Sequence, residues 1–157
     1  MKNADALKQK KLFLFDIDGT LAIGDTLYKG SADLLSWIDA NGGKSYFITN
    51  NSTKSGQDYV EKFHRAFHLD TTEDQFITSG YMTIRFLKEN YADKRIYVLG
   101  TASFIQELRK NGLLVTEAAE EDAACVVVAY DSELTYEKLT QASKMLLTTD
   151  VPFYATN

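Results

Sequence analysis

The sequence has 157 residues, and its 17 lysine and arginine residues against 22 aspartate and glutamate residues give a formal net charge of −5. This negative balance argues against a nucleic-acid partner held through its phosphates. The apolar content of 45% is enough for the core of one domain, or of one domain with part of another.

The single cysteine, Cys125, excludes an intrachain disulfide and lies in the apolar run Ala123–Tyr130. We interpret it as a core residue of a cytoplasmic protein. No apolar run approaches the ~20 residues that span a bilayer, so no membrane partner is expected.

The apolar run Leu12–Phe15, continued by Ile17, predicts a strand of a parallel sheet that is covered on both faces. Asp16 and Asp18 stand at its end, and extended geometry places side chains two residues apart on one face. Two carboxylates about 4 Å apart repel by roughly 4 kcal/mol at an effective dielectric of 20, which favours a bound cation or one raised pKa. Mg²⁺ suits such oxygen ligands. The alternative is that the two aspartates only cap an Asp-Gly turn.

A mobile turn or short hairpin is expected over residues 22–30, beside the carboxylates. Ser31 is predicted to be the N-cap of a helix that ends at Gly42. The strand Lys44–Thr49 follows and ends in the polar cluster Thr49–Thr53. Hydroxyl groups, amides and backbone N–H groups at such a strand end can form an anion cradle, although an ordinary capped loop has the same composition.

The rest of the chain alternates between strand and helix patterns. Helices are predicted over residues 55–67, 81–90, 102–111 and 136–148, and strands over 75–80, 95–100, 113–116, 124–130 and from 152 onward. The pattern restarts after a pause near residue 90. The fold class is therefore α/β, with one domain over residues 1–90 and part of a second over residues 91–157.

The segment Phe15–Leu21, Phe-Asp-Ile-Asp-Gly-Thr-Leu, resembles the first motif of the haloacid-dehalogenase-like (HAD) hydrolases. Thr49–Ser52 is similar to the second motif as it occurs in the class IIA branch, which includes NagD and the 4-nitrophenylphosphatases. The resemblance implies a Rossmann-like catalytic core over residues 1–90 and part of an α/β cap domain over residues 91–157. Segments similar to that cap are Val126–Asp131, Tyr136–Leu139 and Phe153–Asn157.

The resemblance also implies an activity. It makes Asp16 the nucleophile that becomes an aspartyl phosphate and Asp18 the general acid and base, and the second aspartate favours a phosphatase or phosphotransferase over a dehalogenase. Asp16 and Asp18 are the implied Mg²⁺ ligands. The implied substrate-binding residues are Gly19, Thr49, Asn50 and Asn51.

We therefore expect a Mg²⁺-dependent phosphatase that acts on a small phosphorylated metabolite, such as a sugar phosphate, a nucleotide or an aryl phosphate. Two alternatives remain. The chain could be a non-hydrolytic module that binds Mg²⁺ and phosphate or accepts a phosphoryl group, or it could belong to a phosphomutase.

The third family motif, a lysine, and the fourth, a Gly-Asp pair with a further aspartate, have no clear counterpart in these 157 residues. Lys110 and Asp131 could replace them, although Asp131 lacks the flanking residues of the fourth motif. We therefore expect the N-terminal part of a longer enzyme, inactive alone. The first strand would then be an exposed apolar edge that favours a homo-oligomer or completion by another chain.

Overall fold

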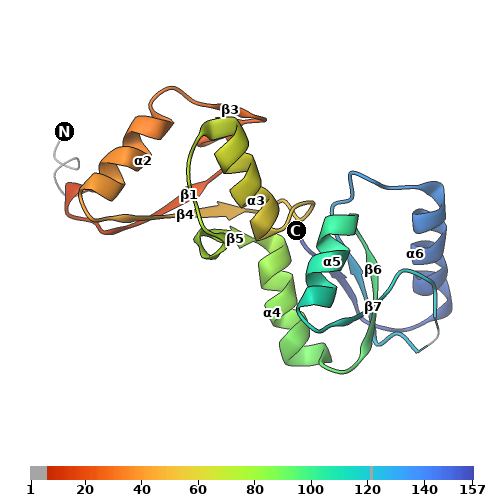
Figure 1. Cartoon of the computed structure of the whole chain (residues 1–157). Helices are drawn as coiled ribbons and strands as arrows, with labels where there is room; N and C mark the ends of the chain where they lie inside the picture. Colours follow the sequence, from red (N-terminus) through yellow and green to blue (C-terminus); the bar gives the residue numbers. More distant parts are fainter. Residues whose placement is uncertain (1–6, 121) are drawn as a thin grey trace. The chain divides into compact units, whose positions relative to one another are not determined.

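The computed structural model describes residues 7–120 and 122–157 (Figure 1). Its elements in chain order are β1 (Leu12–Asp16), β2 (Ala22–Ile23), β3 (Thr26–Leu27), α2 (Ser31–Ala40), β4 (Lys44–Thr49), α3 (Gly56–Lys62), the π-helix η1 (Phe63–Phe67), the 3₁₀ helix η2 (Glu73–Gln75), β5 (Phe76–Thr78), α4 (Ser79–Tyr91), β6 (Arg95–Leu99), α5 (Ala102–Lys110), β7 (Leu114–Thr116), β8 (Cys125–Val128), α6 (Tyr136–Thr148) and β9 (Phe153–Ala155).

The chain forms two compact units. The first contains residues up to Thr49 together with Gly56–Ile77, and the second contains Asn50–Ser55 together with Thr78–Asn157. Among the described residues, no helix combines the length and apolar character needed to cross a membrane.

The first unit is built on the sheet β1-β4-β5, in which β1 and β4 are parallel and Asp16 pairs with Ile48. Aromatic side chains fill its core. The ring of Phe47 on β4 lies 4.7 Å from that of Phe63 and 5.2 Å from that of Phe76, measured between centroids. Phe63 packs η1 against the sheet and Tyr59 packs α3 into the same core, where the sequence predicts one helix over residues 55–67.

The prediction that β1 is covered on both faces is wrong. Leu12 and Leu14 are 61% and 56% exposed, whereas Phe15 packs against the core of the first unit. Within the described residues, β1 is the edge strand of its sheet, with β4 as its neighbour. A run of apolar residues cannot distinguish a strand that is buried on both faces from an edge strand that leaves one face open.

The segment after β1 forms the short hairpin expected over residues 22–30, with β2 and β3 antiparallel. The prediction that Ser31 is an N-cap is wrong. Gly30, with φ of 90°, occupies that position, and no side chain caps the helix there. Ser31 is instead the first residue of α2, and its hydroxyl donates to the carbonyl oxygen of Leu21 at 3.0 Å.

The second unit is built on four parallel strands in the order β7-β6-β8-β9. Successive residues of β6 alternate between two apolar cores: Ile96 and Val98 pack on the side of α4 and α5, whereas Tyr97 packs with Ala142 and Met145 of α6. This strand is covered on both faces, and its uninterrupted apolar sequence reflects that position.

Helix α4 makes its contacts in the second unit, where Ile84 and Leu87 are buried in the same core as β6. The two compact units therefore meet in the chain near Thr78, whereas the sequence pattern paused near residue 90. The assignment of residues 1–90 to a catalytic core and residues 91–157 to a cap stays a prediction.

Cys125 provides a test of the second core. Its side chain is fully buried, and burial raises the pKa of the thiol to about 11. Only about one thiol in a thousand would be ionised at pH 8, and that one is shielded from solvent. We expect iodoacetamide at pH 8 to leave the folded chain unalkylated and to alkylate it completely in 8 M urea. Mass spectrometry measures both outcomes. Equal rates in both conditions would contradict this packing.

Candidate active site

The two predicted catalytic carboxylates flank a buried anchor. Ile17 is 0% exposed and belongs to the core of the first unit, whereas Asp16 and Asp18 on either side of it are exposed. β1 ends at Asp16, the buried Ile17 begins the turn that follows, and Asp18 pairs with Ala22 in an isolated bridge, so the expected extended geometry does not continue through Asp18. The end of β1 thus presents both carboxylates to solvent.

A tight turn follows these residues. The backbone N–H of Gly19 donates to the carbonyl oxygen of Ala22 at 2.8 Å, and the N–H of Ala22 donates to Ile17 at 3.1 Å. Gly19 has φ of +85°, a conformation that side chains disfavour. Glycine at this position therefore allows the chain to reverse directly beside Asp16 and Asp18.

Thr20 contacts the predicted nucleophile, since its hydroxyl donates to Oδ2 of Asp16 at 2.9 Å. This hydrogen bond orients one oxygen of the Asp16 carboxylate. Thr20 lies in the sequence motif but is not among the predicted site residues. The sequence feature that could have indicated this contact is the position of Thr20 directly after Gly19. The turn at Gly19 brings the Thr20 side chain back to the end of β1.

Thr49 ends β4, the strand beside β1, so the parallel pairing brings it to the same sheet edge as Asp16. Its side chain is buried and shares a hydrogen bond with the phenol of Tyr59 on α3. Burial raises the pKa of Tyr59, the bond to Thr49 lowers it, and the nearby charge of Asp18 raises it. Tyr59 is therefore a protonated phenol at neutral pH that is hydrogen-bonded to Thr49. No local pattern indicates this role for Tyr59, which lies within the helix predicted over residues 55–67.

Asn50 and Asn51 follow Thr49 in the chain but make their contacts in the second unit. The carbonyl oxygen of Asn50 accepts from the Ser79 hydroxyl at 3.0 Å. The side-chain oxygen of Asn51 accepts from the N–H of Thr53 at 2.8 Å, which closes a local turn. The first unit thus brings together Asp16, Asp18, Gly19 and Thr49, whereas Asn50 and Asn51 belong to the second unit.

The carboxylates of Asp16 and Asp18 fit a magnesium ion in their chemistry. Mg²⁺ is usually held by one or two carboxylates and completed by water and phosphate oxygens. Both side chains are exposed, so a metal could reach them. Among the residues that the structure describes, no cluster of three histidine, cysteine, aspartate or glutamate side chains forms a metal site.

Asp131 is not available as a replacement metal ligand. Its side chain is 1% exposed, and Oδ2 accepts from the ammonium group of Lys138 at 2.9 Å. Its other oxygen accepts from the N–H of Glu133 at 2.8 Å. Both oxygens are therefore engaged inside the second unit.

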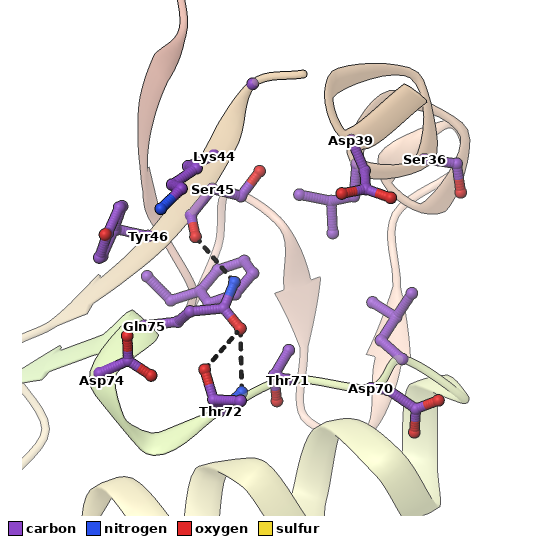
Figure 2. Close-up of a pocket in the computed structure, with 14 residues that line it drawn as sticks. Ser36, Asp39, Lys44, Ser45, Tyr46, Asp70, Thr71, Thr72, Asp74 and Gln75 are labelled. Atoms are coloured by element: carbon purple, nitrogen blue, oxygen red, sulfur yellow. Dashed lines mark hydrogen bonds between the residues drawn. The ribbon is translucent and has the colours of Figure 1, made fainter. Parts of the chain in front are cut away.

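A cavity of about 410 Å³ lies at the other half of β4, away from Thr49, between Lys44–Phe47, α2 and residues 69–75 (Figure 2). Inside it, Gln75 donates to the carbonyl oxygen of Ser45 at 3.0 Å and accepts from the N–H of Thr72 at 2.9 Å. None of the predicted catalytic or phosphate-binding residues lines this cavity.

Open α/β sheets bind ligands beyond the carboxyl ends of their strands, which is where Asp16 and Asp18 stand. Comparison with known proteins identifies the class. The family model for haloacid dehalogenase-like hydrolases matches residues 13–114, which include the Asp16–Asp18 turn and the Thr49–Ser52 cluster. The chain belongs to this family.

Solved structures confirm the resemblance to the NagD branch, as two of them illustrate. The 4-nitrophenylphosphatase of Thermotoga maritima superposes with a TM-score of 0.83 and 33% identity, over 96% of this chain and 56% of that one. NagD from E. coli K-12 gives a TM-score of 0.78 and 28% identity, over 94% of this chain and 57% of that one. The predicted fold class is thereby confirmed.

An acid sugar phosphatase of Staphylococcus aureus (strain USA300) is 31% identical over 137 residues, which are 87% of this chain and 52% of that protein. The chain thus spans about half the length of the curated relative it matches.

Proposed function

We propose that this chain carries the nucleophile-bearing part of a Mg²⁺-dependent phosphomonoester hydrolase. The observation that carries the proposal is the pair of exposed carboxylates, Asp16 and Asp18, held around the buried Ile17 at a strand end. Membership of the haloacid dehalogenase-like hydrolases supports it. Residues 1–90 would supply the first part of the catalytic core, and residues 91–157 part of the cap.

The proposed reaction has two displacements at phosphorus. In the first, an Asp16 oxygen bonds to phosphorus while the bond to the substrate oxygen breaks, and the Asp18 carboxylic acid gives its proton to the leaving alkoxide. In the second, Asp18 takes a proton from water, which attacks the same phosphorus. The Asp16–phosphate bond breaks, and inorganic phosphate leaves. The Thr20 bond to Oδ2 of Asp16 would favour Oδ1 as the attacking atom.

Hydrogen-bond donors beside the carboxylates would hold the phosphoryl oxygens. Gly19, Thr49, Asn50 and Asn51 make up this set, with the Thr49 hydroxyl oriented by Tyr59 and the Asn50 backbone N–H directly after it. Bound Mg²⁺, held by the Asp16 carboxylate and the Asp18 backbone carbonyl, would offset the charge shared by phosphate and the two aspartates.

The substrate class is a small phosphorylated metabolite. Similar proteins are named for activity on sugar phosphates and on 4-nitrophenyl phosphate, which supports a monoester with a small leaving group. We propose a sugar phosphate as the natural substrate type and an aryl phosphate as a convenient assay substrate.

We expect slow or absent turnover by these 157 residues alone. Asp16, Asp18 and a phosphate dianion repel one another, and the lysine of the third family motif and the aspartates of the fourth have no clear counterpart in these 157 residues. The measurement is release of inorganic phosphate from a monoester panel with Mg²⁺, by the 157-residue chain and by any longer natural protein that contains it. Fast turnover by the 157-residue chain as a monomer would contradict this expectation.

The substitution Asp16→Asn tests the nucleophile in the natural protein that contains this chain. We expect hydrolysis of 4-nitrophenyl phosphate to fall by roughly 10³-fold or more, because a carboxamide cannot form the aspartyl phosphate. Thermal unfolding should be almost unchanged, since one of two repelling charges is removed. Turnover close to that of the unmodified protein would exclude Asp16 as the nucleophile.

The substitution Asp18→Asn is the matched comparison, because it removes the same charge two residues away. We expect turnover to fall by about 10²–10⁴-fold through loss of proton transfer, while Asp16 can still be phosphorylated by an activated aryl phosphate. Intact-mass measurement after rapid quenching should show the phosphorylated variant. Unchanged rates across the pH range would remove Asp18 from the mechanism. Stoichiometric phosphorylation of the unmodified protein without phosphate release would favour a phosphoacceptor module instead.

A further inference from the structure

Ser52 is a buried polar residue whose contacts join distant parts of the chain. Its side chain is 0% exposed, yet it belongs to the short polar segment Asn50–Ser55. The Ser52 hydroxyl oxygen accepts from the backbone N–H of Tyr130 at 3.0 Å and from the Thr156 hydroxyl at 3.0 Å. These partners follow the last residues of β8 and β9.

Two further hydrogen bonds fix the same segment within the second unit. The Thr101 hydroxyl, directly after Gly100 at the end of β6, donates to the carbonyl oxygen of Thr53 at 3.0 Å. The Ser79 hydroxyl, at the start of α4, donates to the carbonyl oxygen of Asn50 at 3.0 Å. The segment is therefore attached near both of its ends and in the middle.

The position of these contacts explains their importance. In the order β7-β6-β8-β9, the chain leaves β6 toward β7 on one side and returns to β8 on the other, so the strand order reverses between β6 and β8. Open α/β sheets normally bind ligands beyond the carboxyl ends of the strands at such a point. Here the chain's own segment Asn50–Ser55 contacts the residues that follow β6, β8 and β9.

We propose that Ser52 is a positioning residue for the phosphoryl-binding backbone at Asn50, an inference that rests on the proposed phosphatase function. Ser52 lies two residues after Asn50, and its two acceptor bonds restrict the backbone torsions between them. Thr156 and Tyr130 act through Ser52 and need not touch the substrate. Strand ends of the second unit thus set the orientation of a donor that serves the reaction.

The first experiment tests the anchor in the 157-residue chain by amide hydrogen exchange. Ser52→Ala should accelerate exchange of the Tyr130 amide by about tenfold or more, because its acceptor is gone. The Ala129 amide, which donates to the Leu99 carbonyl oxygen at 2.8 Å, is the neighbouring control and should keep its protection. Equal acceleration at both amides would indicate general unfolding and contradict a local anchor.

The second experiment measures positioning in the natural protein that contains this chain. Ser52→Ala should raise both KM for 4-nitrophenyl phosphate and the inhibition constant of inorganic phosphate by about tenfold, with a smaller fall in kcat. A purely structural defect would lower the active fraction, reducing apparent kcat and leaving both constants unchanged. Unchanged constants in a folded Ser52→Ala protein would overturn the proposal.

Thr156 supplies a matched pair if Ser52→Ala does not fold. Thr156→Val removes the hydroxyl at nearly constant volume, whereas Thr156→Ser keeps it. We expect the valine variant to raise KM and the inhibition constant of phosphate a few-fold. The serine variant should have values close to those of the unmodified protein. Equal constants in the two variants would overturn the proposal. If the unmodified protein neither hydrolyses the substrate nor binds phosphate, the proposed function itself fails, and the exchange result at Tyr130 still decides whether Ser52 is an anchor.

Discussion

Repulsion between Asp16 and Asp18 is the constraint on which the proposed chemistry depends. The chain keeps the two charges adjacent by burying Ile17 between them and by reversing direction at Gly19. Such a pair is tolerable in water because both carboxylates are exposed and well solvated. A bound phosphate dianion would add to the repulsion between the two carboxylates. The arrangement is therefore useful for catalysis only if a cation and oriented hydrogen-bond donors accompany the substrate.

The aromatic core of the first unit provides the rigidity for this arrangement. Phe47 packs against Phe63 and Phe76, and Tyr59 stacks on Phe76 with ring centroids 5.5 Å apart. Tyr59 extends from that core to Thr49, and its pKa responds to Asp18, so one buried ring connects packing to the polar edge. Loss of a core aromatic side chain would therefore disturb the positions of the residues at the strand ends as well as lower the stability of the fold.

Local patterns in the sequence predicted the elements well and the contacts between them poorly. The strand and helix patterns predicted β6 and α6, and the expected bounds of α6, residues 136–148, agree with the structure. The same reasoning failed at β1, because an apolar run does not report how many of its faces are covered. Thr20 and Tyr59 have partners that only the folded backbone brings near. The bonds of Ser52 span 78 and 104 residues, a separation that no local pattern encodes.

The two sheets use their carboxyl edges in different ways. In the first unit, β1 and β4 end at the residues assigned to the proposed reaction: carboxylates, a hydroxyl and a turn glycine. In the second unit, the ends of β6, β8 and β9 bind the chain itself through Ser52 and Thr53. A polar segment held at an edge of this kind satisfies backbone groups that would otherwise need water or a ligand. The segment that is held in this way begins directly after Thr49, so β4 is followed at once in the chain by residues that are fixed within the second unit.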